Sequence, residues 1–360
     1  MKILILGSYH GNNKGDEIIF YSLFQRLNKV FDKPKITVVT KDPDYFHNIY
    51  GVDAVKPEKL IKLIKILKNS DLVIIGGGGL FFDYGLLDTL KISGKSQILY
   101  WLMISWVANF YKKDILWYSV GFGPINTRFS NWALRKSIKL PMYITTRDNL
   151  SQKLVLGLGR KDPIESRDCV FGLNLKNNKN KKANKIITLF PRYWKNKENS
   201  IILRFKEIIS YGLEDGYGFV ISCTNSKTDM KICERIYSSF KSNSSVSFKP
   251  LKKNDSLKKF NDLLTNSRLI VTMRMHPVIL ASLSEIPSIA IEYNTPKIVS
   301  CMNELGLSKY CLSLDVPIKK TLGAFRNLIN DQGIKKEINH KLKQIRKLEN
   351  ENENVIRKFN

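Results

Sequence analysis

Residues 268–292 read "RLIVTMRMHPVILASLSEIPSIAIE" and contain two apolar runs separated by a segment long enough for a helix. The runs 269–273 and 287–292 are rich in Ile and Val, which favour β-strands. Pro277 has the backbone angle of a first helical residue, so the sequence predicts a helix at 277–284. Two strands joined by such a helix form a parallel β-α-β unit.

The same alternation of apolar runs and amphipathic segments extends along the chain in both directions. Repeated β-α-β units predict open parallel sheets with helices on both faces. The predicted strands are 3–7, 36–40, 72–76, 115–120, 142–146, 164–168, 186–190, 217–222, 246–248, 269–273 and 287–292. The predicted helices are 16–29, 57–69, 96–112, 129–139, 149–157, 197–211, 226–240, 255–266, 277–284 and 296–305.

The segment 174–185, "NLKNNKNKKANK", is polar, charged and without periodicity, which is typical of a linker. We place a domain boundary there and expect two doubly wound, Rossmann-like domains, 1–175 and 176–318. Residues 319–360 are helical in pattern and highly charged, and they either close the second domain or cross back to the first.

The chain has 59 Lys and Arg against 32 Asp and Glu, a net charge of +27 that should attract anionic partners. The charge is spread along the chain without any nucleic-acid-binding motif, so nucleic acid is not an expected partner. The remaining interpretations are an acidic small substrate, an anionic membrane surface, or a merely solvated lysine-rich surface.

Cysteine usage and apolar runs indicate a protein of the cytosol. The five cysteines are scattered and lack C-x-x-C spacing, so we expect neither a disulfide framework nor a metal site. The first residues read as a strand rather than a signal peptide. The longest apolar run, 98–111, is shorter than the roughly 20 residues of a membrane span and predicts a buried helix.

Ligands of open parallel sheets bind beyond the carboxyl ends of the strands, so the loops after the strands are informative. The first loop, "GSYHGNNKGDE" at 7–17, contains Asn12, Gly15 and Asp16. Its backbone could approach a ligand closely, although its spacing matches no nucleotide-binding motif. The alternative is a tight turn in which Asp16 caps the next helix.

Two further loops of the first domain contain candidate residues. Four glycines at 76–79, Gly78 and Gly79 among them, follow a predicted strand and would let a ligand lie against bare amides, with Asp83 at the rim. The alternative is a crossover without a ligand. In "ITTRDNLS", Arg147 follows a strand and is either an anion ligand or a salt-bridge partner.

Arg274 and His276 lie where an apolar strand meets a helix start. Two residues apart on one strand, they should point to the same side of the sheet. The helix N-terminus favours an anion beside them, and a structural histidine is the alternative. The next junction repeats the arrangement with Lys297, so the two predict a phosphate- or carboxylate-binding crevice.

The ordered set "GNNKGDE", "LVIIGGGGLFFD", "SVGFGPI", "TTRDNLS", "SRDCVFGL" and "RMHPVILASLSEIPSIAIEYNTPK" resembles the polysaccharide pyruvyl transferase family over about residues 3 to 307. The resemblance implies a fold like the glycosyltransferase B type, with 1–175 on the acceptor side and 176–318 on the donor side. It also implies phosphoenolpyruvate as donor and a sugar of a surface polysaccharide, free or polyprenyl-pyrophosphate-linked, as acceptor.

Carried over by position, the resemblance assigns roles to individual residues. Arg147 and Lys297 would bind the donor with Arg274 and Met275, and His276 would be the general acid. Asp168 falls on the family's acidic position, although Cys169 replaces the proline that usually follows. The base would be Asp83 or Asp168. The acceptor group would comprise Asn12, Gly15, Asp16, Gly78, Gly79 and Arg192.

These residue types suit the implied reaction, because phosphoenolpyruvate is an anion that needs several cations or helix ends. A histidine with a pKa near neutral is suited to protonating its methylene carbon. Such an enzyme would use no metal and no cofactor. It would be cytoplasmic, and with a polyprenyl-pyrophosphate-linked acceptor it would work at the inner face of the cytoplasmic membrane. The alternatives are a nucleotide-sugar glycosyltransferase of the same fold and a non-catalytic scaffold.

Overall fold

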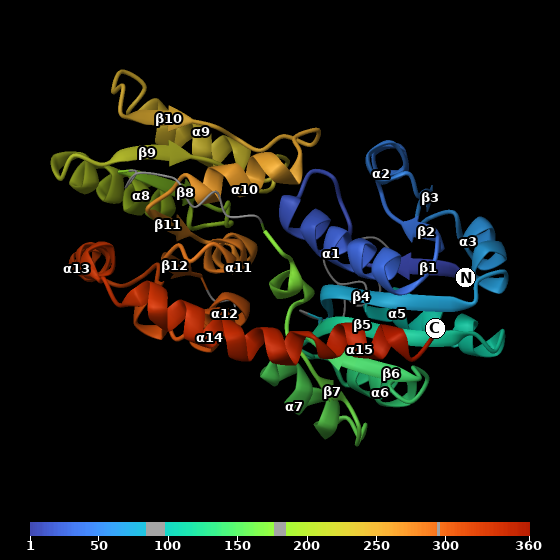
Figure 1. Cartoon of the computed structure of the whole chain (residues 1–360). Coiled ribbons are helices and arrows are strands. Elements are labelled where there is room, and N and C mark those ends of the chain that lie inside the picture. The colour runs from blue at the N-terminus through green and yellow to red at the C-terminus, as the bar shows by residue number, and fades with distance from the viewer. Residues whose placement is uncertain (84–97, 176–184, 294–295) are drawn as a thin grey trace. The chain divides into compact units, whose positions relative to one another are not determined.

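The computed structural model describes residues 1–83, 98–175, 185–293 and 296–360, which divide into two compact units. Unit 1 comprises Met1–Gly11, Asp16–Gly172 and Arg346–Asn360. Unit 2 comprises Asn12–Gly15 and Leu173–Ile345. Each unit is built on one parallel β-sheet, as the repeated β-α-β pattern predicts (Figure 1).

The sheet of unit 1 has the strand order β3-β2-β1-β4-β5-β6-β7, and all its pairings are parallel. The order reverses between β1 and β4, so the chain winds outward in both directions from the centre. The strands are β1 (Lys2–Leu6), β2 (Lys35–Val39), β3 (Asp53–Val55), β4 (Leu72–Phe81), β5 (Asp114–Phe122), β6 (Tyr143–Thr146) and β7 (Ile164–Glu165).

The helices of unit 1 pack on its sheet (Figure 1). They are α1 (Lys14–Val30, which belongs to unit 1 from Asp16 onward), α2 (Pro43–Tyr50), α3 (Leu60–Lys68), α5 (Ile98–Phe110), α6 (Arg128–Ser137) and α7 (Asn149–Gly157). One apolar cluster joins α3, α5, α6 and α7 to the central strands, with Trp117 of β5 fully buried in it. The apolar run at 98–111 is therefore a core-packed helix, as predicted.

Strand β4 runs through the four glycines, so the prediction of a strand ending at residue 76 and a glycine loop beyond it was wrong. A Cβ atom at Gly76 would lie 2.1 Å from the Tyr118 carbonyl oxygen, and one at Gly77 would lie 2.1 Å from Ile19 Cγ2. Gly77 and Gly78 also have positive φ angles of 75° and 92°. Close packing accounts for Gly76 and Gly77, and the positive φ angles account for Gly77 and Gly78, without a ligand.

Unit 2 has the strand order β10-β9-β8-β11-β12-β13, again with parallel pairings throughout. Its strands are β8 (Ile186–Phe190), β9 (Gly218–Ile221), β10 (Val246–Phe248), β11 (Leu269–Thr272), β12 (Ser288–Glu292) and β13 (Cys311–Ser313). Its helices are α8 (Glu198–Glu214), α9 (Met230–Ser238), α10 (Leu257–Thr265), α11 (Met275–Leu283), α12 (Pro296–Glu304) and α13 (Ile318–Asn330).

Helix α11 begins at Met275, two residues before the predicted start at Pro277. His276 therefore belongs to the first helical turn, and Arg274 is the residue that precedes the helix. The prediction that both side chains project from one strand was wrong. The bias of a residue before proline against the α conformation is only a tendency, and it does not prevent a helical His276 here.

The C-terminal residues are shared between the units. Helix α14 (Ile334–Glu349) lies mostly in unit 2, whereas α15 (Glu351–Arg357) lies in unit 1. The segment 319–360, predicted as a separate helical part, is thus divided at Ile345. Cys169–Gly172 forms a 3₁₀ turn where unit 1 gives way to Leu173.

Candidate active site

The candidate site of unit 2 lies at the carboxyl edge of its sheet, where three neighbouring strands end. Arg192 follows β8, Arg274 and His276 follow β11, and Lys297 follows β12. Strands β8, β11 and β12 are adjacent in the sheet, so this edge brings the predicted cations of unit 2 to one side. Helices α11 and α12 begin at the same edge and direct their first N–H groups there.

Arg274 has a carboxylate partner that the sequence did not reveal. Its Nε and Nη2 atoms lie 2.7 and 2.5 Å from Oδ2 of Asp229, a fully buried residue that precedes α9. The other Asp229 oxygen accepts from the Tyr193 N–H at 3.2 Å and from the Thr228 hydroxyl at 2.9 Å. The pair fixes the guanidinium on Asp229, so Arg274 is positioned by a carboxylate before any ligand arrives.

His276 lies in the first turn of α11, half-buried, with Met275 before it. Gly15 of the same unit lies against its ring, because a Cβ atom at Gly15 would stand 2.5 Å from His276 Nδ1. The segment around Gly15 is held by backbone contacts, including Lys14 N–H to the Thr224 carbonyl at 2.8 Å. A glycine at position 15 thus leaves space for the imidazole. This close approach explains why the predicted loop has a glycine there.

Arg192 lies against two aromatic rings that the sequence analysis did not single out. Its guanidinium carbon is 5.6 Å from the centroid of the Trp194 ring and 5.0 Å from that of Tyr293. The Arg192 Nη1 group also donates to the Tyr293 hydroxyl. Because Tyr293 follows β12, this cation–π group joins the ends of two strands across the edge.

In unit 1, Arg147 follows β6 and is almost fully buried. Its Nε atom donates to Oδ2 of Asp148 at 3.2 Å, and Asp148 caps α7 by accepting from the Ser151 N–H at 2.7 Å. Burial would raise the pKa of Asp148, but the Arg147 charge and the Ser151 hydrogen bonds outweigh it and lower the pKa. A Cβ atom at Gly121 would lie 2.4 Å from Arg147 Nε, so this glycine leaves space for the guanidinium.

Asp83 is fully buried and accepts hydrogen bonds from the loop that follows β5. Its Oδ1 accepts from the backbone N–H of Asn126 at 2.9 Å, and its Oδ2 accepts from the Thr127 hydroxyl at 3.2 Å. Thr127 in turn caps α6. The carboxylate thus has a structural use, and its role as a base stays a prediction.

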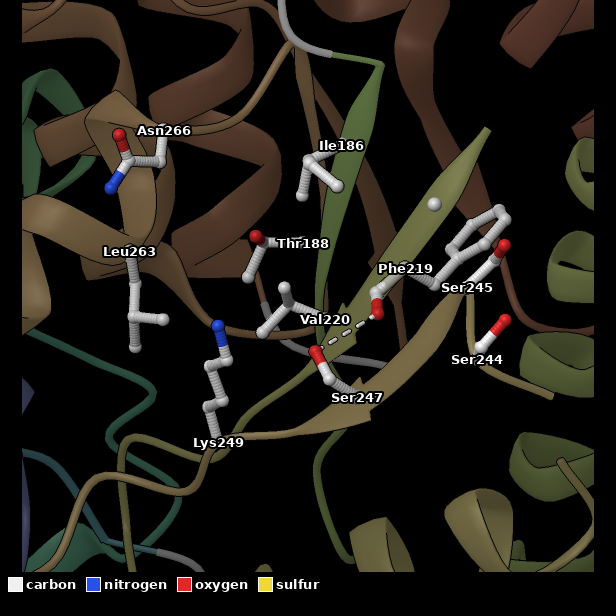
Figure 2. Close-up of a pocket in the computed structure, with 11 residues that line it drawn as sticks. Ile186, Thr188, Phe219, Val220, Ser244, Ser245, Ser247, Lys249, Leu263 and Asn266 are labelled. Carbon is white, nitrogen blue, oxygen red and sulfur yellow. Dashed lines mark hydrogen bonds between the residues drawn. The ribbon is translucent and has the colours of Figure 1, made fainter. Parts of the chain in front are cut away.

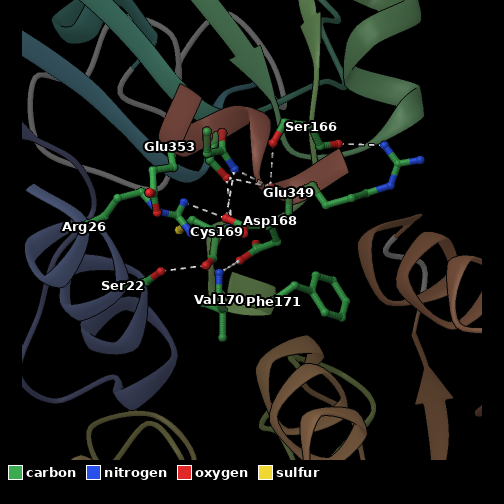
Figure 3. Close-up of polar contacts among 12 residues, drawn as sticks. Ser22, Arg26, Ser166, Asp168, Cys169, Val170, Phe171, Glu349 and Glu353 are labelled. Atoms are coloured by element: carbon green, nitrogen blue, oxygen red, sulfur yellow. Dashed lines mark hydrogen bonds and ion pairs between the residues drawn. The ribbon is translucent and has the colours of Figure 1, made fainter. Parts of the chain in front are cut away.

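Asp168 lies beside the 3₁₀ turn, within a buried polar network of unit 1 (Figure 3). Its Oδ1 accepts from the Val170 N–H at 3.1 Å. Within the described residues Oδ2 has no hydrogen-bond partner. At the next position, Cys169 donates its N–H to the Ser119 hydroxyl at 3.1 Å, a bond that proline could not form.

The other predicted loop residues fall in two places. Asn12 belongs to unit 2, where its carbonyl accepts from the Ser226 N–H at 3.0 Å. Asp16 lies inside the first turn of α1, so the interpretation of Asp16 as the cap was wrong by three residues: Asn13 precedes the helix and accepts from the Gly15 N–H at 3.1 Å. Gly78 and Gly79 lie within β4.

A cavity of about 420 Å³ in unit 2 lies away from the candidate site (Figure 2). Its lining includes Ile186 and Gly218, the first residues of β8 and β9, and Ser245 just before β10. The lining also includes Thr188 and Val220 within these strands and Lys249 just after β10, so the cavity lies over a face of the sheet. Ligands of doubly wound sheets bind instead beyond the carboxyl ends of the strands. Within the described residues no group of three or more metal-ligating side chains occurs at either place.

Comparisons with known proteins agree with this architecture. A family model described as "Polysaccharide pyruvyl transferase" matches residues 13–295. No curated protein matches the sequence significantly. The structure is similar to the S. aureus MnaA-UDP co-structure, with a TM-score of 0.65 and 12% identity over 99% of this chain and 94% of that chain.

Two further solved structures are similar. UDP-GlcNAc 2-epimerase from Neisseria meningitidis bound to UDP-GlcNAc gives a TM-score of 0.64 and 15% identity over 100% of this chain and 99% of that chain. E. coli ADP-heptose lps heptosyltransferase II gives a TM-score of 0.51 and 14% identity over 91% of this chain and 98% of that chain. At these identities the likenesses show the fold alone, which is glycosyltransferase B-like as predicted.

Proposed function

The chain belongs to the polysaccharide pyruvyl transferase family, and from that membership we propose that it is a phosphoenolpyruvate-dependent ketal pyruvyl transferase. The acceptor would be two hydroxyls of one sugar in a bacterial surface polysaccharide or its lipid-linked precursor. The observation that best supports the proposal is the set of cations at the carboxyl edge of the second sheet, beside the first turns of α11 and α12.

The donor is a phosphate ester and a carboxylate at once, so its binding site must neutralise two anionic groups. Arg274, held by Asp229, and Lys297 in the first turn of α12 are the cations of unit 2 proposed for this task. Free N–H groups of the two helix starts add partial positive charge. Arg147 of unit 1 is the donor-binding arginine that the family resemblance assigns, and its role stays a proposal.

His276 is the proposed general acid. Its imidazolium would give a proton to the methylene carbon of phosphoenolpyruvate, leaving an oxocarbenium-like carbon that one sugar hydroxyl attacks. A second hydroxyl then displaces phosphate from the same carbon, which closes the cyclic ketal. Of the two hydroxyl protons released, one restores the imidazolium and the other leaves with phosphate.

The base that accepts the first hydroxyl proton, and then passes it to the imidazole or to phosphate, would be Asp168 or Asp83. Both Asp83 oxygens accept hydrogen bonds from the Asn126–Thr127 loop. Asp168 has one oxygen without a partner within the described residues, which favours it over Asp83. Asp168→Asn should therefore lower turnover more than it lowers donor affinity.

The test is incubation with phosphoenolpyruvate and a panel of galactosides, glucosides and N-acetylmannosaminides, both free and lipid-linked. Release of one phosphate per acceptor modified, with an acceptor mass increased by one pyruvate ketal, is the expected result. Phosphate release without a change in acceptor mass would indicate hydrolysis. No reaction on any acceptor, together with no donor binding, would contradict the proposal.

A nucleotide-sugar glycosyltransferase is the second candidate, because one solved structure of similar fold is a heptosyltransferase and two others contain UDP or UDP-GlcNAc. The two candidates differ in the ligand that stabilises the protein. A ligand that binds only the folded state raises the melting temperature. We expect phosphoenolpyruvate to raise it and UDP or ADP to leave it unchanged, and the reverse result would favour the glycosyltransferase.

We also expect transfer to require no divalent metal, since arginine, lysine and helix ends would carry out the neutralisation that magnesium performs elsewhere. Activity should be unchanged after exhaustive treatment with a chelator. Loss of activity in the chelator with recovery on adding magnesium or manganese would contradict this expectation.

A further inference from the structure

Helices α5 and α6 of unit 1 carry large apolar side chains that face solvent. Met103, Trp106 and Phe110 are exposed at spacings of three and four residues along α5, which places them on one stripe. Phe129 and Trp132 are exposed one turn apart on α6. We call these five side chains the aromatic face. The Phe110 side chain is 77% exposed and that of Trp132 57% exposed, so these residues do not belong to the apolar core of unit 1.

Helices α5 and α6 pack against each other, and printed contacts order two of the exposed groups. Trp106 of α5 donates its indole N–H to the Ser137 hydroxyl of α6 at 2.8 Å, which holds the indole across the gap between the helices. On α6 the Phe129 and Trp132 rings stack, with centroids 5.9 Å apart. Single exposed apolar residues are normal on a monomer, whereas grouped ones mark an interaction surface.

The charge around the aromatic face is of one sign. Arg128, Arg135 and Lys136 are exposed on α6, beside the two aromatic rings. No Asp or Glu occurs in 98–113 or in 126–142, the segments that form the two helices and their ends. The face is therefore apolar at its centre and cationic at its border.

A cavity of about 350 Å³ lies at this border. Arg128, Arg135 and Trp132 line it together with Asn126 and Thr127. Two guanidinium groups and an indole wall match a phosphodiester attached to an apolar chain, because arginine binds phosphate through charge-assisted hydrogen bonds. The buried Asp83 fixes this loop by accepting from the N–H groups of Asn126 and Thr127.

We propose that the aromatic face docks the protein on an anionic phospholipid membrane. Trp and Phe side chains partition into the boundary between headgroups and acyl chains, and the adjacent arginines pair with lipid phosphates. A second copy of this chain is a poorer partner, because each copy carries a net charge of +27 and repels the other. Within the described residues no helix could span a bilayer, so attachment through this face would be peripheral.

The test measures binding to vesicles of phosphatidylcholine with or without phosphatidylglycerol, by sedimentation over a salt series and without donor or acceptor. Its outcome is therefore independent of the transfer reaction. We expect binding to the anionic vesicles that weakens as salt rises, because exposed charges are screened over about 8 Å at physiological ionic strength. Negligible binding to both vesicles at low salt would overturn the proposal.

Paired variants test the face itself. The double variant Phe129→Ser and Trp132→Ser should bind anionic vesicles about a hundredfold more weakly, because it removes two aromatic rings from the apolar boundary of the membrane. The control is Leu203→Ser on α8 of unit 2, which is 58% exposed in the native chain and should bind like wild type. Equal binding by the double variant and the Leu203→Ser control would show that charge alone attracts the protein to the vesicles. It would exclude the aromatic face as the docking surface.

Arg128→Gln and Arg135→Gln should each weaken binding about fivefold, since a cation near an anionic surface contributes about 1 kcal/mol. Lys241→Gln removes the same charge from an exposed loop of unit 2 and should have little effect. Melting curves would confirm that every variant folds. A wild-type dimer that dissociates in the Phe129→Ser, Trp132→Ser variant would assign the face to self-association and overturn the membrane proposal.

Discussion

Gly121 determines whether the Arg147 guanidinium can lie against strand β5, because a Cβ atom there would approach Nε to 2.4 Å. Gly121→Ala is therefore expected to displace the guanidinium and to weaken phosphoenolpyruvate binding as Arg147→Ala does. A hydrogen bond to a charged group contributes about 1.5–3 kcal/mol, so both variants should lose about tenfold or more in affinity. Calorimetric titration with the donor measures the effect.

Gly157→Ala is the matched control. Gly157 ends α7, and a Cβ atom there would meet nothing within 4 Å. This variant should bind the donor normally and gain at most about 0.5–1 kcal/mol in stability, because alanine costs less backbone entropy than glycine. Wild-type donor affinity in Arg147→Ala would show that this arginine is structural.

His276→Ala should keep the fold and measurable donor binding but lose most turnover, because a proton donor acts in the transition state more than in the ground state. The expected loss in kcat is about 10²–10⁴-fold. His340→Ala removes an exposed histidine of α14 and should retain full turnover. Turnover near wild type in the His276 variant would exclude His276 as the acid.

The positions of some candidate-site residues were predictable from sequence because each follows an apolar strand and precedes a helix. That position places Arg147, Arg274 and Lys297 at the carboxyl edge of a sheet, whatever the rest of the chain does. Asp229 and Tyr293 lacked such a signal. Asp229 reads as an ordinary residue at a helix start, and its pairing with Arg274 spans 45 positions of sequence.

At the scale of elements, the long strands and helices were predictable from their periodicity, and β8 and β10 have the predicted bounds. Strands β3 and β13, each three residues long, were missed, as was α2. Three residues show too little alternation to identify a strand, so these two depend on pairing with a neighbour. Glycine is depleted in strands, so the four glycines gave no sign that β4 continues through them. The close contact of Gly76 with Tyr118 of β5 explains the glycine there.

The element pair α9 and α11 should depend on the Asp229–Arg274 ion pair, because Asp229 is fully buried. Asp229→Ala leaves Arg274 without its carboxylate, and breaking a buried ion pair costs about 3–5 kcal/mol. Glu198→Ala breaks the exposed pair of Glu198 with Arg235 in the same unit and should cost at most about 1 kcal/mol. Urea denaturation measures the free energy of unfolding of the two variants. Equal losses of unfolding free energy in both would contradict the expectation.

At the scale of the whole molecule, sequence predicted two Rossmann-like parts but not how the chain's end is shared between them. The residues after Ile345 return to unit 1, where they meet α1 and the 3₁₀ turn Cys169–Gly172 (Figure 3). Arg346 Nε donates to the Phe171 carbonyl at 3.3 Å, and Asn352 Nδ2 donates to the Arg167 carbonyl at 2.9 Å. Such contacts join residues more than 170 positions apart, which no local pattern encodes.

Arg26 and Glu349 form the centre of this return. The guanidinium makes two bonds to the Glu349 carboxylate, 2.6 and 3.0 Å long, and Nη1 also donates to the Tyr118 hydroxyl at 2.7 Å. Burial raises the pKa of Glu349 and the Arg26 charge partly offsets it. Gly172 makes space for the pair, since a Cβ atom there would lie 2.2 Å from Arg26 Nη2.

Glu349→Ala should therefore destabilise unit 1 by up to about 3–5 kcal/mol, because it leaves the buried Arg26 charge with only the more distant Glu353 carboxylate, 3.8 Å from Nε. Glu349→Gln should recover part of the loss, as its amide oxygen can still accept from the guanidinium. Asp315→Ala, which breaks the exposed pair with Lys197, should cost at most about 1 kcal/mol. Thermal unfolding followed by circular dichroism measures all three variants. If Glu349→Ala had the same melting temperature as Asp315→Ala, the residues after Ile345 would be attached to the surface of unit 1 rather than part of its core.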